Sequence, residues 1–250
     1  MFALRQLHSQ FVVKVPEPIT SFEGKTIIIT GGNTGLGFEA AKYYLKLKAS
    51  RVILACRSLE KADKAKLELE QSFPISGHIV ETWQVDLSSY ASVIQFYEKA
   101  RSLPRLDVLL LNAGIMTKEY RVAEDNESTI TVNRFSSSVI SYLYTAQTTP
   151  LSSTPYNQVG VNQISPPRSP LRFKKKLEGF MGRTTEEGAI SLVFATSFGK
   201  ESHGKYVGNG RLLSESCFVT SKDGAVAGEK LWTQLSSKLE KIRPNVMQGF

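Results

Sequence analysis

The segment Thr30-Gly31-Gly32-Asn33-Thr34-Gly35-Leu36-Gly37 carries most of the information in this chain. It follows the apolar run 26–29 and precedes apolar residues at helical spacing, so we expect a strand, a glycine-rich turn and the start of a helix. Glycines let the backbone approach a ligand, and free N–H groups at a helix N-terminus bind phosphate oxygens. The segment therefore predicts a turn that binds a dinucleotide pyrophosphate. The alternative is an ordinary glycine turn before a helix.

The length and composition favour one domain spanning residues 1–250. The chain is 41% hydrophobic, which suffices for one α/β core. It has two cysteines, and Cys56 ends a predicted strand, so we expect no disulfide framework and a reducing, cytoplasmic location. No apolar run reaches the length of a membrane span, and residues 1–13 lack the apolar centre of a secretory signal.

The basic character of the chain does not predict a nucleic-acid partner. The net charge is +8 and the pI is about 9.4. The Lys and Arg residues are scattered among acidic neighbours, and the densest cluster, residues 172–176, is typical of a solvated loop or helix face. A modest positive potential would attract a polyanionic cofactor.

The first half of the chain alternates between strand and helix patterns. We expect strands at 26–30, 51–55, 78–84 and 108–111, and helices at 36–47, 59–71 and 89–100. This alternation predicts an α/β fold with a doubly wound, Rossmann-like parallel sheet. Ligands of such sheets bind beyond the carboxyl ends of the strands.

Arg57 follows the second predicted strand and points to the choice of cofactor. An acidic residue there would bind a ribose 2′-OH and favour NAD, whereas the planar fork of Arg57 fits a 2′-phosphate and favours NADP. Lys61, one helical turn later, offers a second cation. The alternative is that Arg57 only begins a surface loop.

Together these features resemble the short-chain dehydrogenase/reductase family. Its cofactor turn has the T-G-x-x-x-G-x-G spacing, and its other cofactor motifs occur here in the same order. The resemblance implies that Asp86 and Leu87 contact adenine, that Asn112-Ala113-Gly114 lies against the cofactor ribose, and that Asn133 corresponds to the Asn of an Asn-Ser-Tyr-Lys catalytic tetrad. The cofactor-binding residues implied are Thr30, Gly31, Asn33, Gly35, Leu36, Gly37, Arg57, Lys61, Asp86, Leu87, Asn112, Ala113 and Gly114.

The resemblance breaks after Asn133. The family continues with a fifth strand, a helix carrying Tyr-x-x-x-Lys and a sixth strand. Here residues 134–175 form an atypical insert rich in Ser, Thr, Pro and Asn, which predicts irregular chain over about 136–170 in place of these strands. None of Tyr142, Tyr144 and Tyr156 has a Lys four residues later. The one such pair in the sequence, Tyr44 and Lys48, lies on the helix after the glycine turn and is interpreted as a coincidence.

The family pattern resumes near residue 176, where the chain resembles fungal retinol-dehydrogenase-like members. We expect a capping box at Thr184 and Glu187, and a closing amphipathic helix marked by Trp232, Leu235, Leu239 and Ile242. His203 is expected to be structural or exposed. The resemblance implies an NADP(H)-dependent enzyme that interconverts a carbonyl and an alcohol on a medium-sized apolar small molecule, in fungal secondary metabolite biosynthesis.

Two alternatives remain open at this point. The encoded protein lacks the catalytic segment and is a catalytically impaired NADP-binding relative, or the sequence comes from a truncated or mis-spliced gene model. The sequence also leaves a homo-oligomer open.

Overall fold

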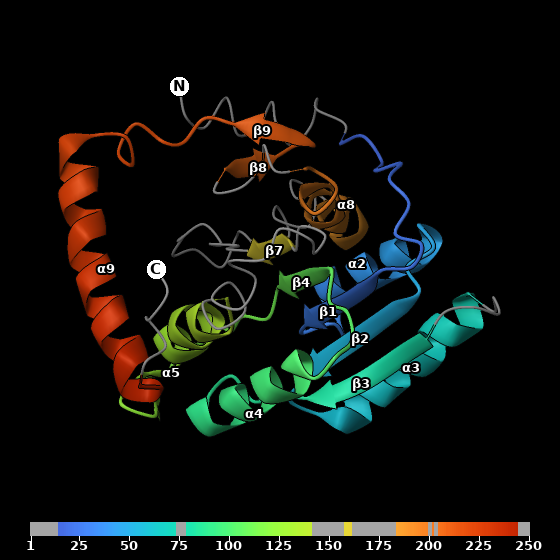
Figure 1. The fold of residues 1–250 in the computed structure, drawn as a ribbon, viewed down its shortest axis with the longest axis horizontal. Coiled ribbons are helices and arrows are strands. Elements are labelled where there is room, and N and C mark those ends of the chain that lie inside the picture. The colour runs from blue at the N-terminus through green and yellow to red at the C-terminus, as the bar shows by residue number, and fades with distance from the viewer. Residues whose placement is uncertain are drawn as a thin grey trace.

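The computed structural model describes residues 15–73, 79–141, 184–199, 202 and 205–244, together with the backbone of residues 158–161. Its central feature is a parallel sheet in the strand order β3-β2-β1-β4-β7 (Figure 1). The strands are β1 (Thr26–Thr30), β2 (Arg51–Cys56), β3 (Ile79–Gln84), β4 (Val108–Leu111) and β7 (Gln158–Val161). The doubly wound, Rossmann-like sheet expected from the sequence is confirmed.

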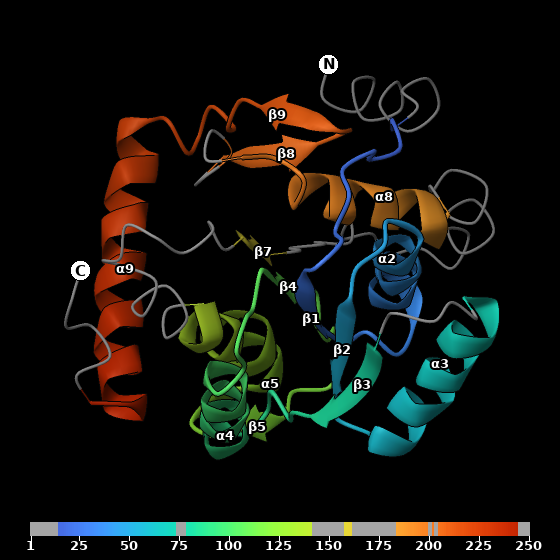
Figure 2. The same ribbon diagram turned by 45° about the vertical axis from the view of Figure 1, so that its right-hand side comes forward.

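Helices cover both faces of the sheet (Figure 2). They are α2 (Gly35–Lys46), α3 (Leu59–Ser72), α4 (Tyr90–Arg101), α5 (Ser128–Ile130), the π-helix η1 (Thr131–Ser136) and α8 (Thr185–Ala195). Helix α9 (Lys222–Ile242) stands at one side of the molecule. The structure also contains two short hairpins, one of β5 (Val122–Ala123) with β6 (Asn126–Glu127) and one of β8 (Tyr206–Gly208) with β9 (Arg211–Leu213).

The alternation of side chains along the strands divides the core in two. Ile27 and Ile29 face a cluster with α2, α3 and α8, while Ile28 faces a cluster with α4, η1 and the end of α9. All three isoleucines are fully buried. Because both faces are covered, β4 is apolar throughout and β1 and β2 are apolar between their ends, and this is why the sequence reveals them so clearly.

The expectation of irregular chain over 136–170 is wrong at two places. The chain is helical through Ser141, and Gln158–Val161 pairs in parallel with β4, in the position next to it that the fifth strand takes. Val159 and Val161 give this strand its β propensity, but it is short and its Ser- and Pro-rich flanks hid it. Residues 142–157 and 162–183 of the insert and its flank lie outside the described residues.

Among the described residues, helix α9 packs on the core through its C-terminal half. Leu239 is buried, and Leu235 and Ile242 pack against the same core cluster. Every residue from 225 to 234 is exposed, so the predicted apolar face of this helix is buried only in part, with Trp232 47% exposed. Within the part of the chain that is described, no helix combines the length and the hydropathy needed to cross a bilayer.

Candidate cofactor-binding site

The glycine turn lies where β1 ends and α2 begins, and two of its glycines are required by backbone conformation. Gly31 and Gly35 have φ of +67° and +60°, in the left-handed region that side chains disfavour. The Gly31 N–H donates to the Ala55 carbonyl oxygen of β2 at 2.8 Å. A Cβ at Gly31 would lie 3.1 Å from the Ala113 Cα, so the turn also packs closely against the loop after β4.

Gly37 is required because a side chain at this position would not fit. A Cβ there would lie 2.5 Å from both the Asn112 Nδ2 and the Gly31 carbonyl oxygen. Its neighbour Leu36 contacts α8, where a Cβ at Gly188 would lie 2.6 Å from the Leu36 Cδ2. The turn is therefore fixed from both sides, by the loop after β4 and by α8.

The N-terminus of α2 is the feature of this turn best suited to an anion. Its N-cap residue, Thr34, makes no side-chain hydrogen bond to the helix, and no acidic residue lies in the first turn. Helices α3, α4, α8 and α9 differ, because each has a side-chain cap, from Ser58, Ser89, Thr184 and Ser221 respectively. No side chain caps the first N–H groups of α2, and uncapped N–H groups at a helix N-terminus are suited to an anion.

Thr30 and Asn112 join the turn to the loop after β4. The buried Thr30 Oγ1 accepts hydrogen bonds from the backbone N–H groups of Asn112 at 3.0 Å and Ala113 at 3.1 Å. The Asn112 Nδ2 donates back to the Thr30 carbonyl oxygen at 3.0 Å. These bonds hold the carboxyl ends of β1 and β4 as one unit, the arrangement that the sequence predicted for a ligand site.

Asn133 joins the same loop to η1. Its Oδ1 accepts from the Ile115 N–H and its Nδ2 donates to the Ile115 carbonyl oxygen, both at 2.8 Å. A Cβ at Gly114 would lie 3.3 Å from the Asn133 Oδ1, so Gly114 gives the amide room. Asn133 therefore lies beside Asn112-Ala113-Gly114, and its side chain is committed to holding the loop. Whether its backbone acts in catalysis stays a prediction.

Arg57 and Lys61 lie at the end of β2 and in the first turn of α3. Both are exposed, and neither side chain forms an ion pair with a described residue. Ala55, two residues before Arg57, pairs with Thr30 in the sheet, so Arg57 follows the strand directly beside the glycine turn. Asn33 lies in that turn, and the backbone N–H groups of Asn33 and Gly32 partly oppose the rise that burial causes in the pKa of the Cys56 thiol. The arrangement leaves two cations available to an anion beside the turn.

Asp86 and Leu87 form a tight turn after β3. The Asp86 Oδ1 accepts from the Ser88 N–H at 2.9 Å and from the Ser88 Oγ at 2.6 Å. Leu87 is buried, and its carbonyl oxygen accepts from the Ser136 Oγ of η1 at 2.6 Å. The structure thus places the predicted adenine-side residues and the predicted ribose-side loop at the same edge of the sheet, with η1 touching both. Sequence analysis missed Ser136, since a Ser among other Ser residues gives no signal of its own.

Tyr44 is the one tyrosine in the sequence with a Lys four residues later, so its surroundings bear on whether it can act as a catalytic acid. Tyr44 is fully buried and its hydroxyl shares a 2.8 Å hydrogen bond with the Thr196 Oγ1. Burial raises the pKa of Tyr44, and the bond from Thr196 only partly opposes this. Lys48 lies beyond the end of α2 and is exposed, so this pair is not arranged as an acid site. The Tyr142, Tyr144, Tyr156 and His203 side chains lie outside the described residues.

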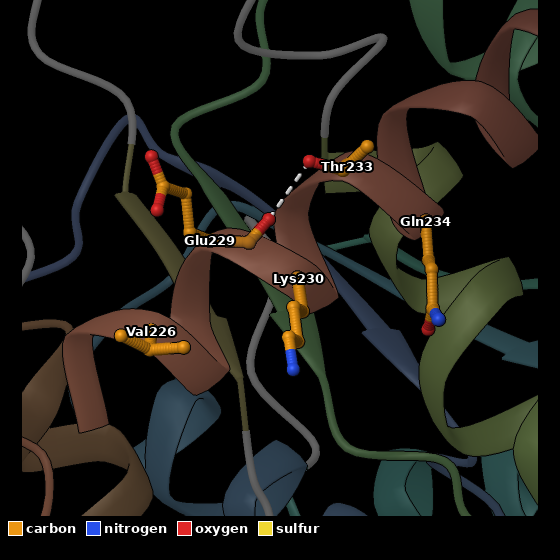
Figure 3. A pocket seen from close by; sticks show the side chains of 5 residues that line it. All are labelled: Val226, Glu229, Lys230, Thr233 and Gln234. Atoms are coloured by element: carbon orange, nitrogen blue, oxygen red, sulfur yellow. Dashed lines mark hydrogen bonds between the residues drawn. The ribbon is translucent and has the colours of Figure 1, made fainter. Parts of the chain in front are cut away.

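A separate hollow of about 420 Å³ runs along α9 and contains none of the predicted site residues. Its described lining is Val226, Glu229, Lys230, Thr233 and Gln234 (Figure 3). The hydrogen bond drawn there, from the Thr233 Oγ1 to the Glu229 carbonyl oxygen, is internal to the helix. Among the described residues, the hollow is lined by one face of one helix.

Residues 25–149 match the family described as short chain dehydrogenase. A short chain dehydrogenase/reductase of Cryptosporiopsis sp. is 31% identical over an alignment covering 98% of this chain and 99% of the relative. This chain belongs to the short-chain dehydrogenase family. That alignment spans 321 positions, more than the 250 residues of the chain, so the relative carries internal sequence that this chain lacks.

Two further short-chain dehydrogenases and one solved structure are also similar to this chain. A short-chain dehydrogenase of Penicillium roqueforti is 31% identical over 98% of this chain and 85% of its own length. One from Emericella nidulans is 50% identical, but over only 52% of this chain and 40% of its own. A solved Pseudomonas aeruginosa RhlG/NADP complex is 25% identical over 48% of this chain and 46% of that chain, with a TM-score of 0.39.

Proposed function

We propose that this family member binds NADP(H) and prefers it to NAD(H). Arg57 carries the proposal, because its guanidinium follows β2 beside the glycine turn and forms no ion pair with a described residue. A guanidinium holds a phosphate through two parallel charge-assisted hydrogen bonds, and Lys61 adds a second charge nearby. In NAD-specific sites this position carries an acidic residue instead.

The residues present fit such a cofactor. The uncapped N–H groups of α2 suit its pyrophosphate. At Gly31 and Gly37 a side chain would collide with neighbouring atoms, so only glycine fits the turn there. We assign Asp86 to the adenine side of the cofactor and Asn112-Ala113-Gly114 to a ribose. When bound, the nicotinamide supplies or accepts a hydride. The residues of this chain bind and orient the cofactor.

We propose that the ancestral reaction of the chain is the interconversion of a carbonyl and an alcohol on a medium-sized apolar small molecule. The fungal relatives, as short-chain dehydrogenases, support this chemistry, and we place it in secondary metabolite biosynthesis. Two free cysteines, with Cys56 buried in the core, favour a reducing, cytoplasmic location. A homo-oligomer remains compatible with the chain.

A second function is favoured by a specific observation: the only Tyr-x-x-x-Lys pair in the sequence has its Tyr sealed in the core. Hydride transfer to a carbonyl leaves an alkoxide-like oxygen that needs a proton donor with a lowered pKa. A chain without that donor is an NADP-binding relative with weak or no turnover. The amide of Asn133 cannot replace it, because an amide does not titrate near neutral pH.

Calorimetric titration of the Arg57→Glu variant with NADPH and NADH tests the cofactor assignment. The substitution should erase or reverse the preference for NADPH, a change of about 1–3 kcal/mol for a charge-assisted bond. Lys222→Glu makes the same change of charge at the start of α9, away from the glycine turn, and should leave the preference unchanged. An Arg57→Glu variant with the native ratio of the two affinities would refute the assignment.

A further inference from the structure

Three side chains of the π-helix η1 form hydrogen bonds to three different loops. Thr131 Oγ1 donates to the Ala123 carbonyl oxygen of the β5–β6 hairpin at 2.8 Å. Asn133 holds Ile115 after β4, and Ser136 Oγ donates to the Leu87 carbonyl oxygen after β3. A π-helix winds more widely than an α-helix, and single π-turns are frequent at functional sites. One short segment thus holds both loops proposed to contact the cofactor.

The bond from Ser136 fixes the peptide group between Leu87 and Ser88 at one end. The other end of that peptide group, the Ser88 N–H, donates to the Asp86 Oδ1 at 2.9 Å. A peptide group is planar, so its carbonyl and its N–H turn together. The orientation of the Asp86 carboxylate is therefore coupled to the Ser136 hydroxyl through one rigid group, and Ser136 is fully buried, with no water to compete.

We propose that Ser136 is a positioning residue for the adenine-side loop of the cofactor site. This inference rests on the proposed function, because it assigns Asp86 to the adenine half of NADP(H). Ser136 does not touch the cofactor; it acts by holding the Leu87–Ser88 peptide group, and thereby Asp86, in the orientation that binds. Removing the hydroxyl leaves the Leu87 carbonyl oxygen buried without this donor and lets the peptide group turn.

The test compares Ser136→Ala with Ser137→Ala. Ser137 is the neighbouring buried serine, but its hydroxyl bonds to the Val132 carbonyl oxygen of the same helical segment at 3.4 Å, so its loss leaves the Asp86 loop untouched. Each variant is titrated with NADPH and with adenosine 2′,5′-bisphosphate, which carries only the adenine half. Hydrogen exchange of a peptide covering residues 85–92 reports on the loop without any cofactor.

Ser136→Ala should weaken the binding of NADPH and of the bisphosphate by the same factor, about twofold to tenfold. It should also speed hydrogen exchange in the 85–92 peptide. Ser137→Ala should change neither. If Ser136→Ala does not fold, Ser136→Cys keeps nearly the same volume with a weak donor and should show a smaller weakening of both ligands.

Unchanged binding of the bisphosphate or unchanged exchange in the Ser136 variant would overturn the inference. If the native protein nevertheless prefers NADPH, and Arg57→Glu removes that preference, the proposed function still stands. Native protein that binds neither NADPH nor the bisphosphate would overturn both.

Discussion

Replacing Gly37 with Ala probes the site at its tightest contact. A Cβ there would lie 2.5 Å from the Asn112 Nδ2 and from the Gly31 carbonyl oxygen, nearly 1 Å inside ordinary van der Waals contact at 3.4 Å. One neighbour is backbone, and the other donates at 3.0 Å to the Thr30 carbonyl oxygen, so neither can move freely. Overpacking of this kind costs about 1–3 kcal/mol of stability. Displacing the turn should also weaken NADPH binding about tenfold or more, because it moves the N–H groups that we assign to the pyrophosphate.

Urea denaturation measures the loss of stability, and calorimetric titration measures the loss of affinity. Gly228→Ala is the matched control, since a Cβ at that exposed position of α9 meets nothing within 4 Å. It should leave NADPH binding unchanged and add up to about 1 kcal/mol of stability through helix propensity. A Gly37→Ala variant with native stability and native NADPH affinity would show that the close contacts of Gly37 do not shape the cofactor site.

Three further outcomes are expected. Tyr44→Phe should cost about 0.5–1.5 kcal/mol in urea denaturation, for the lost bond to Thr196, without changing the preference for NADPH; a changed preference would mean that Tyr44 acts on the site. NADPH oxidation against a panel of ketones and quinones should be 10²–10⁴-fold below that of an enzyme with a positioned general acid, and turnover near one per second would refute this. Burial raises the pKa of Glu81, but hydrogen bonds from Arg51 and Trp83 outweigh it and leave the pKa below its ordinary value of 4.5. The resulting stabilisation is present above that value and lost as the pH falls through the folded-state pKa, so Glu81→Gln should lose less stability than the native chain between pH 7 and about pH 3.

Local signals in the sequence predicted most of the first half of the fold. Ile27, Ile28 and Ile29 indicate a strand buried on both faces, and Ser89 and Thr184 are capping residues whose bonds the structure confirms. These features depend on neighbouring residues alone, which is why periodicity and capping patterns detect them.

The features that sequence reasoning missed depend on contacts between distant residues. The strand at 158–161 exists through its pairing with β4, and four residues between Ser- and Pro-rich flanks carry too little pattern to reveal it. The role of Ser136 arises from the approach of η1 to Leu87, 49 positions away in the chain. The exposure of Trp232 depends on which parts of the chain pack against α9, which the helical period cannot report.

The central claim, that Arg57 makes this an NADP-preferring cofactor site, is tested most directly by titrating the native chain with NADP⁺ and NAD⁺ side by side at low ionic strength, where charge-assisted contacts are least screened. The account predicts that NADP⁺ binds about tenfold or more tightly than NAD⁺, with the difference shrinking as salt is added. Equal affinities for the two cofactors, or a tighter complex with NAD⁺, would contradict it.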